Sequence, residues 1–347
     1  MRLSRLFRPP VIGLDIGSDA VKAVVLRPSR GAWALAAAVE VPLDGTGTSD
    51  PDAIADALNE VFTTLKVRRA NIASALSGQA VIVKRLSLPS MTDGELAESI
   101  PWEAEQYIPF DLSDVHLDYQ VLANDPQRST IEVLLVAAKK ERIDERTSLI
   151  LRSGRRPVIL DVEAFALVNA YQENYPDRAD PLTLLLHVGR AGTIVCLLER
   201  GQLAFTRDIA LGGQSYTDAL IRELDVEPTM AERLKHAGRA HDAEVDAAHV
   251  AGILRDVSTQ LVAEVSKSVE FYRASAPLEA ISRIVLSGGA CQAEGLADLL
   301  TSEFDAPIEV MNPFLRVGRS GRHAATEGVE AIYAVAVGLA MRQDGAA

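Results

Sequence analysis

A run of small and charged residues near the start of the chain has the spacing of a phosphate-binding turn. Asp15–Lys22 reads Asp-Ile-Gly-Ser-Asp-Ala-Val-Lys and follows an apolar stretch. Gly17 permits a tight turn whose backbone N–H groups can reach phosphate oxygens. Ser18 can donate its hydroxyl, Lys22 supplies a positive charge and Asp15 can hold hydrated Mg²⁺. An ordinary hairpin can carry the same pattern, so both interpretations stay open for this stretch alone.

A second stretch with similar spacing lies near the middle of the chain. His187–Thr193 reads His-Val-Gly-Arg-Ala-Gly-Thr, again after an apolar run. Two such turns that face one another across a two-lobed fold would hold phosphates from both sides. The presence of both turns in one chain favours phosphate binding over two unrelated hairpins.

Two further groups could complete a nucleotide site. An apolar stretch ends in Gly288-Gly289 and a helix is expected to begin near Gln292, so backbone could pass close under a nucleotide. Glu232 and Lys235 are three residues apart and share one helix face, where they could flank a ribose and base. A glycine-rich corner and an exposed ion pair are the alternatives for these two groups.

Strands and helices alternate in the order needed to position these residues. Val11 to Leu26 predicts strand, turn, strand, and Trp33 to Val41 predicts a third strand. Pro51 then starts a helix with apolar residues at helical spacing. The strand–turn–strand pattern returns from Leu182, and Ser215 to Ala274 is mostly helical. The sequence therefore predicts an internal repeat of two β-meanders.

Between the two repeats, residues 87–160 predict a compact insertion. It opens with an acidic helix from Ser90 to Gln106 that is interrupted near Pro101, and it continues with two strands, a helix and a final strand from Pro157. Its larger apolar residues are Trp102, Tyr107, Ile108, Phe110 and Tyr119, in a chain with 5% aromatic residues. These side chains fit either the core of the insertion or a groove for a short apolar peptide.

Charge and hydropathy argue against several classes of function. A formal net charge of −13, with no basic run beyond the Arg-rich start, argues against nucleic-acid binding. The longest apolar run, Ala331 to Met341, is about half the length that crosses a bilayer, so we expect a cytoplasmic protein. Cys196 and Cys291 lie in apolar stretches without metal-ligand spacing, which indicates buried structural thiols.

Taken together and in this order, the two hairpins, the Ala-Glu-x-x-Lys helix and the late Ser-Gly-Gly strand resemble the actin/Hsp70/hexokinase superfamily. Within it, the chain is similar to the PilM family of type IV pilus assembly proteins, close to FtsA. The narrower resemblance rests on Gly13–Val25, on Glu98–Phe110 with Leu117–Gln120, and on Tyr333–Arg342. It covers nearly the whole chain.

The resemblance implies an α/β, actin-like fold of two related RNase H-like lobes with an inserted small α+β subdomain. The first lobe is expected to comprise residues 1–86, 161–181 and 325–347, and the insertion residues 87–160. The second lobe is expected at residues 182–324, with a helical subdomain at 214–278.

The resemblance also implies ATP and Mg²⁺ in the cleft between the lobes. The residues carried over for nucleotide binding are Asp15, Gly17, Ser18, Asp19, Lys22, Gly189, Arg190, Thr193, Glu232, Lys235, Gly288 and Gly289, with Asp15 also at the metal. The family's second motif usually opens with Asp, and here that position is His187. A neutral imidazole cannot replace a carboxylate toward hydrated Mg²⁺, and a protonated one repels the metal. We therefore expect nucleotide binding with weak or absent hydrolysis.

For function, the resemblance implies a cytoplasmic scaffold that lies at the inner membrane through a PilN-like partner, whose cytoplasmic N-terminal peptide it binds. Contacts with other pilus motor components and self-association are further expectations. Two alternatives stay open. One is a sugar or carboxylate kinase, for which Asp161 is the candidate base and a helix cap the competing interpretation. The other is an FtsA-like, filament-forming protein.

Overall fold

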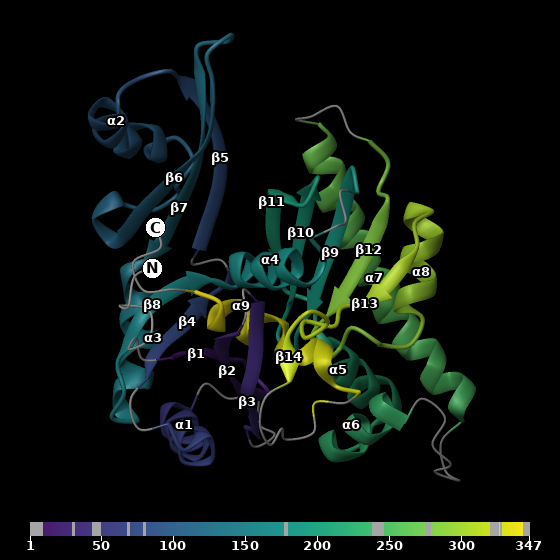
Figure 1. Ribbon diagram of the computed structural model, residues 1–347. Helices are drawn as coiled ribbons and strands as arrows, with labels where there is room; N and C mark the ends of the chain where they lie inside the picture. The colour runs from purple at the N-terminus through teal and green to yellow at the C-terminus, as the bar shows by residue number, and fades with distance from the viewer. Residues whose placement is uncertain are drawn as a thin grey trace.

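The computed structural model describes residues 10–342 except 30–31, 44–49, 68–69, 79–80, 177–179, 238–245, 275–278, 320–325 and 327 (Figure 1). The helices are α1 (Pro51–Leu65), α2 (Asp93–Glu105), α3 (Lys140–Arg152), α4 (Glu163–Asn174), α5 (Gly213–Leu224), α6 (Pro228–Ala237), α7 (Ala247–Arg273), α8 (Leu296–Phe304) and α9 (Ala334–Ala340), with 3₁₀ turns at Leu112–Asp114 and Glu330–Tyr333. The strands are β1 (Val11–Ile16), β2 (Ala20–Ser29), β3 (Ala32–Pro42), β4 (Asn71–Leu76), β5 (Val81–Pro89), β6 (Val115–Asp125), β7 (Thr130–Lys139), β8 (Pro157–Val162), β9 (Leu182–Val188), β10 (Thr193–Glu199), β11 (Gln202–Ile209), β12 (Arg283–Ser287), β13 (Ile308–Val310) and β14 (Gly318–Arg319).

Two sheets with the same internal arrangement form the two lobes. The first has the strand order β14-β3-β2-β1-β4-β8 and the second has the order β11-β10-β9-β12-β13. In the first sheet β1 is antiparallel to β2 and parallel to β4. In the second sheet β9 is likewise antiparallel to β10 and parallel to β12. The predicted repeat of two meanders is confirmed.

Helices α4 and α9 lie between the two sheets (Figure 1). The core there joins Leu26 of the first sheet and Leu185 of the second to Tyr171 of α4 and Val337 of α9. Helix α1 and Ile150 of α3 cover the outer face of the first sheet. Helices α7 and α8 cover the outer face of the second. This layering leaves the two hairpin turns at one edge of the shared core.

The C-terminal apolar run is a core helix. Every residue of α9 is buried. A Cβ atom added to Gly338 would lie 1.7 Å from the backbone oxygen of Ala166 in α4, and one added to Gly13 of β1 would lie 2.0 Å from the backbone oxygen of Ala336. Two glycines therefore let α9 approach β1 and α4 at backbone distance. Within the described ranges no helix is long and apolar enough to cross a membrane.

A separate three-stranded antiparallel sheet, in the order β5-β7-β6, forms the insertion. Helix α2 packs on it through Leu96, Ile100 and Ala104. The expected interruption of this helix at Pro101 is wrong, because α2 runs through the proline. A proline removes only one backbone donor, and the buried residues on either side of it keep α2 on the sheet.

The last part of the segment between the repeats packs on the first lobe. Ile150 of α3 lies in the core beside α1. Strand β8 pairs in parallel with β4 of the first sheet. The sheet of the insertion itself runs from Val81 to Lys139.

Candidate functional site

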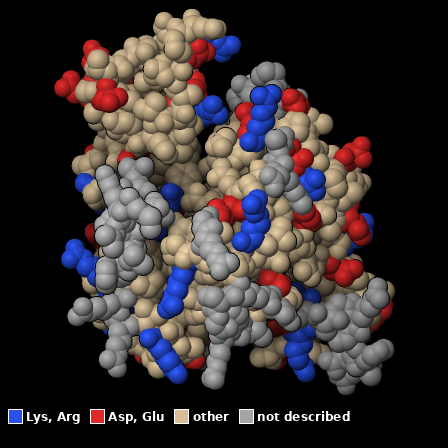
Figure 2. Space-filling view, viewed as in Figure 1, with Lys and Arg blue, Asp and Glu red and all other residues tan. Residues whose placement is uncertain are grey.

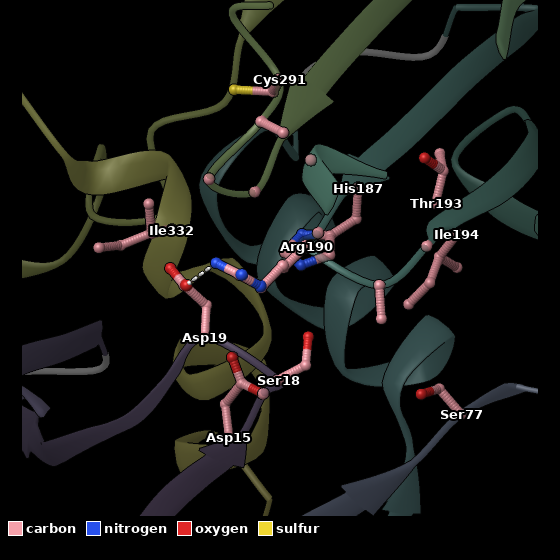
Figure 3. Close-up of a pocket in the computed structure, with 18 of the residues that line it drawn as sticks. Asp15, Ser18, Asp19, Ser77, His187, Arg190, Thr193, Ile194, Cys291 and Ile332 are labelled. Carbon is pink, nitrogen blue, oxygen red and sulfur yellow. Dashed lines mark hydrogen bonds and ion pairs between the residues drawn. The ribbon is translucent and has the colours of Figure 1, made fainter. Parts of the chain in front are cut away.

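The twelve residues that the resemblance assigns to a nucleotide line one cavity of about 850 Å³ between the two lobes. His187 lies in its wall as well. Figure 3 shows Asp15, Ser18 and Asp19 on the side of the first lobe, with His187 and Arg190 opposite them. The structure thus brings together residues that are up to 274 positions apart in the sequence.

The two hairpin turns have the same backbone geometry. The N–H of Gly17 donates to the carbonyl of Ala20 at 3.1 Å, and the N–H of Gly189 donates to the carbonyl of Gly192 at 2.9 Å. Each glycine begins its turn two residues after an aspartate or histidine at the strand end, Asp15 or His187. The repeat therefore extends from the sheets to the turns that face the cavity.

An ion pair joins the two turns across the cavity. The guanidinium of Arg190 lies 2.8 Å from the carboxylate of Asp19 (dashed in Figure 3) and 3.6 Å from that of Glu232. The Arg190 side chain is 14% exposed, so little water screens these contacts. On the first lobe, Lys22 lies 3.9 Å from Asp15. The cavity therefore holds cations and carboxylates already balanced against one another.

Glu232 and Lys235 form a built pair in the cavity wall, 2.6 Å apart. Thr217 of α5 donates to Glu232 at 2.7 Å and accepts from Lys235 at 2.9 Å. Burial favours a raised pKa for Glu232, but hydrogen bonds from Lys235 and Thr217 outweigh burial and lower that pKa. The alternative of a solvated surface pair does not describe these side chains.

Gly288 and Gly289 follow β12 at the far wall of the cavity. Gly288 has a φ of +90°, and a Cβ atom there would lie 2.4 Å from the carbonyl oxygen of Val188 in β9. A glycine is needed at this position because only glycine adopts that φ freely and leaves room for the neighbouring strand. Gly289 faces open space at the cavity. The expected helix start near Gln292 is wrong, since turns fill this segment and α8 begins at Leu296.

Thr193 lines the cavity, but its hydroxyl donates to the carbonyl of Leu211 at 2.7 Å. This bond ties the start of β10 to the loop before α5. Gly212 fills the same corner, where a Cβ atom would lie 2.5 Å from the carbonyl oxygen of Gly189. The second turn is thus held in shape from behind, and the Leu-Gly-Gly run after β11 was the sequence signal for it.

His187 stands where the first turn has Asp15. Its Nδ1 lies 3.1 Å from the hydroxyl of Ser287, which itself donates to the carbonyl of Leu186. Burial lowers the pKa of His187 to about 4, against a smaller opposing effect of Asp15. The imidazole is therefore neutral at physiological pH and accepts or donates hydrogen bonds without carrying charge.

Sequence reasoning missed three titratable groups that face the cavity. Burial, together with repulsion from Asp15, raises the pKa of Glu163 at the start of α4 to about 7. Burial also raises the pKa of Asp208 on β11, which accepts from the N–H of Gly78 across the lobes at 3.0 Å. Arg146 of α3 donates to the carbonyl of Ile16 at 3.0 Å. No local motif marks these residues, because the fold alone brings them to the cavity.

Three other residues do not act on the cavity's chemistry. Asp161, the candidate kinase base, accepts two hydrogen bonds from Arg342, at 2.6 and 2.8 Å, and is not among the cavity residues. The competing interpretation as a helix cap is also wrong, since α4 begins without a side-chain cap. Cys196 and Cys291 are free and buried, and burial raises their pKa values to about 12 and 11.

The large apolar residues of the insertion divide into two groups. Ile108 is in its core, with Phe110 and Tyr119 packed partly buried against that core. Trp102 is 72% exposed and Tyr107 is 41% exposed. Lys84 of β5 lies over the Tyr107 ring at 5.2 Å.

Comparison with known proteins decides the family. The family model for the type IV pilus assembly protein PilM matches residues 13–344. The chain belongs to the PilM family. A solved PilM-PilN type IV pilus biogenesis complex contains a chain that is 28% identical to this PilM-family protein. The match covers 96% of this chain and 98% of that one, with a TM-score of 0.81.

More distant structures share the fold. The ethanolamine utilization protein EutJ from Carboxydothermus hydrogenoformans is 13% identical, with 96% of this chain and 89% of that chain covered and a TM-score of 0.57. MreB 5 of Spiroplasma citri bound to AMPPNP is also 13% identical, with 95% and 94% covered and a TM-score of 0.51. At this identity they report on the fold alone. The expected actin-like α/β fold is confirmed.

Proposed function

We propose that this PilM-family protein binds ATP with Mg²⁺ in the cleft between its lobes and acts as a scaffold of type IV pilus assembly. The convergence of two glycine turns, a Glu–Lys pair and a Gly-Gly corner on one cavity carries the proposal. The cavity of about 850 Å³ falls in the range typical of small-molecule sites. The AMPPNP-bound MreB structure, which shares the fold, supports a nucleotide as the ligand.

In this proposal both lobes hold the phosphates. The turns at Gly17 and Gly189 present backbone N–H groups, and Ser18 and Lys22 add a hydroxyl and a charge. Asp15 holds Mg²⁺ through its water shell, which would screen phosphate charge. Asp19, Arg190 and Thr193 line the same turns, Glu232 and Lys235 contact ribose and base, and Gly288 and Gly289 lie under the adenosine.

Arg190 couples nucleotide binding to the position of the lobes. In the structure it pairs with Asp19 of the opposite turn. A phosphate oxygen is a stronger partner for a guanidinium than one exposed carboxylate, so Arg190 exchanges Asp19 for phosphate on binding. A ligand that rearranges a contact between two lobes shifts the equilibrium between their arrangements.

The scaffold's partner in this proposal is the cytoplasmic N-terminal peptide of a PilN-like inner-membrane protein. The similarity to a PilM-PilN complex over nearly the full length of both chains supports it. We assign part of the peptide's groove to the insertion, because Trp102 and Tyr107 remain exposed there. A disordered peptide needs such apolar anchors to offset the ordering entropy that it loses on binding.

Calorimetry with ATP and Mg²⁺ tests the nucleotide site. We expect a dissociation constant between low micromolar and millimolar. Lys22→Ala should weaken binding about 10- to 100-fold, the value of one charge-assisted hydrogen bond. Lys267→Ala, at an exposed lysine of α7, is the matched control and should not change the affinity. Absence of binding at millimolar ATP would sink the proposal.

His187 should keep hydrolysis slow. A neutral imidazole beside Ser287 offers no charge to a hydrated metal. His187→Asp should make ATP binding more dependent on Mg²⁺, because a second carboxylate then faces the metal across from Asp15. Affinity measured with and without Mg²⁺ checks this. A wild-type turnover of about one per second or faster, as in a working enzyme, contradicts the expectation.

A further inference from the structure

Positive charge is concentrated at one end of the first sheet. Strands β1, β4 and β8 are parallel and begin at this end, whereas β2 runs the other way and ends there. The chain segments that enter or leave the sheet at these strand ends are residues 1–10, 27–31, 66–70 and 152–156. They contain 11 Lys and Arg and no Asp or Glu, in a chain whose net charge is −13. We call these four segments the basic end.

The described side chains of the basic end face solvent. Arg27, Lys66 and Arg156 are exposed, and Arg155 is half-buried with its guanidinium 5.1 Å from the Phe62 ring. An open cavity of about 560 Å³ lies between α1 and the segment after α3, lined by Phe62, Lys66, Arg155 and neutral residues. Arg152 is balanced by Asp52 of α1 at 2.6 Å. None of the cavity's lining residues carries a carboxylate, so it suits an anionic headgroup.

Negative charge is concentrated in the insertion. Residues 86–127 include nine Asp and Glu and no Lys or Arg. They begin in β5 and include α2 and β6, and Figure 2 shows acidic groups along the outer side of this part of the molecule. The insertion follows the opposite end of β4 from the basic end. Such a separation of charge orients a protein in the field of a charged surface.

The sequence of the first basic segment distinguishes a membrane from an acidic protein. Residues 2–8 read Arg-Leu-Ser-Arg-Leu-Phe-Arg and lead into β1 at this end. Basic residues interleaved with leucine and phenylalanine are typical of segments that bind the interface of anionic bilayers. An acidic protein surface would satisfy the arginines but gives no reason for three apolar residues among them.

We propose that the basic end binds the surface of an anionic membrane directly. The cations of the strand ends contact lipid headgroups, and Leu3, Leu6 and Phe7 enter the boundary between headgroups and acyl chains. This contact uses neither the nucleotide cleft nor the insertion. It would hold the scaffold with its basic end on the bilayer and its acidic insertion directed into the cytoplasm.

Co-sedimentation of the full chain with vesicles, without nucleotide or partner, tests the proposal. Wild type should bind phosphatidylcholine vesicles that contain about 30% phosphatidylglycerol, bind pure phosphatidylcholine much less, and dissociate as salt rises. Arg27→Glu/Lys66→Glu/Arg156→Glu should weaken binding at least about tenfold. Arg128→Glu/Arg222→Glu/Lys267→Glu makes the same charge change at exposed sites elsewhere and should bind like wild type.

Leu3→Ser/Leu6→Ser/Phe7→Ser keeps every charge and should also weaken binding, which covers the case in which the triple charge reversal does not fold. Equal binding of the basic-end variants and wild type overturns the proposal, as does a wild type that ignores anionic vesicles. Sedimentation velocity without vesicles gives the other contrary outcome. If the charge reversal abolishes self-association and vesicles bind neither protein, the basic end belongs to a second copy's acidic insertion.

Discussion

Gly338→Ala should lower the free energy of unfolding by about 3 kcal/mol or more, the upper range for overpacking a core. The added Cβ would lie 1.7 Å from the backbone oxygen of Ala166 and 2.5 Å from its carbonyl carbon. No side chain can rotate to relieve these contacts, because they are with backbone. Helix α9 must then separate from α4, and the core between the two sheets loosens.

Thermal and denaturant unfolding measure this effect against a matched substitution. Gly252→Ala adds the same methyl group to the middle of α7, where nothing lies within 4 Å of the new Cβ. It should stabilise the protein by up to about 1 kcal/mol, because alanine is the better helix former. A Gly338→Ala protein as stable as wild type would show that α9 does not pack on α4 as described.

Replacing residues 82–137 by a short Gly/Ser linker should abolish binding of the partner peptide and leave ATP binding intact. The replacement removes α2, β6 and nearly all of β5 and β7, with Trp102 and Tyr107. Val81 and Ala138 are paired residues of β5 and β7, so the cut ends already lie side by side. A deletion of residues 87–160 would instead remove Ile150 and β8, and with them part of the first lobe.

Point variants give the same test without a deletion. Trp102→Ala should weaken the peptide at least about tenfold if this exposed ring is an anchor, as buried aromatic anchors in interfaces commonly do. Phe271→Ala removes a ring that is 64% exposed on α7 of the other lobe and should have no effect. The assignment of the groove fails if the shortened protein melts cooperatively, binds ATP and still binds the peptide with wild-type affinity.

The sequence predicted the repeated parts of this molecule well, because they depend on local pattern. Gly17 and Gly189 follow apolar strands at the same spacing, and their turns have the same hydrogen bond. Asp50 and Pro51 predicted the start of α1, where Asp50 accepts from the N–H of Asp52 at 3.0 Å. Strand alternation and helix starts are read within a few residues, so a single sequence suffices for them.

The parts that the sequence did not predict depend on contacts between distant segments. Glu163 and Asp208 have no motif, and their place at the cavity follows from where α4 and β11 lie. Asp161 was interpreted from its position before a helix, but Arg342, 181 residues later, accounts for it. The Arg190–Asp19 ion pair joins residues 171 positions apart. Pairing of this kind becomes visible only when both lobes are in place.

The most direct test of the proposed scaffold is the affinity of a labelled N-terminal peptide of the PilN-like partner for the full chain, measured by fluorescence anisotropy with and without saturating ATP and Mg²⁺. Binding in both conditions, with affinities that differ at least about fivefold, is the expected result, because Arg190 couples the cleft to the arrangement of the lobes. Equal affinities would contradict the nucleotide switch. No peptide binding in either condition would contradict the scaffold itself.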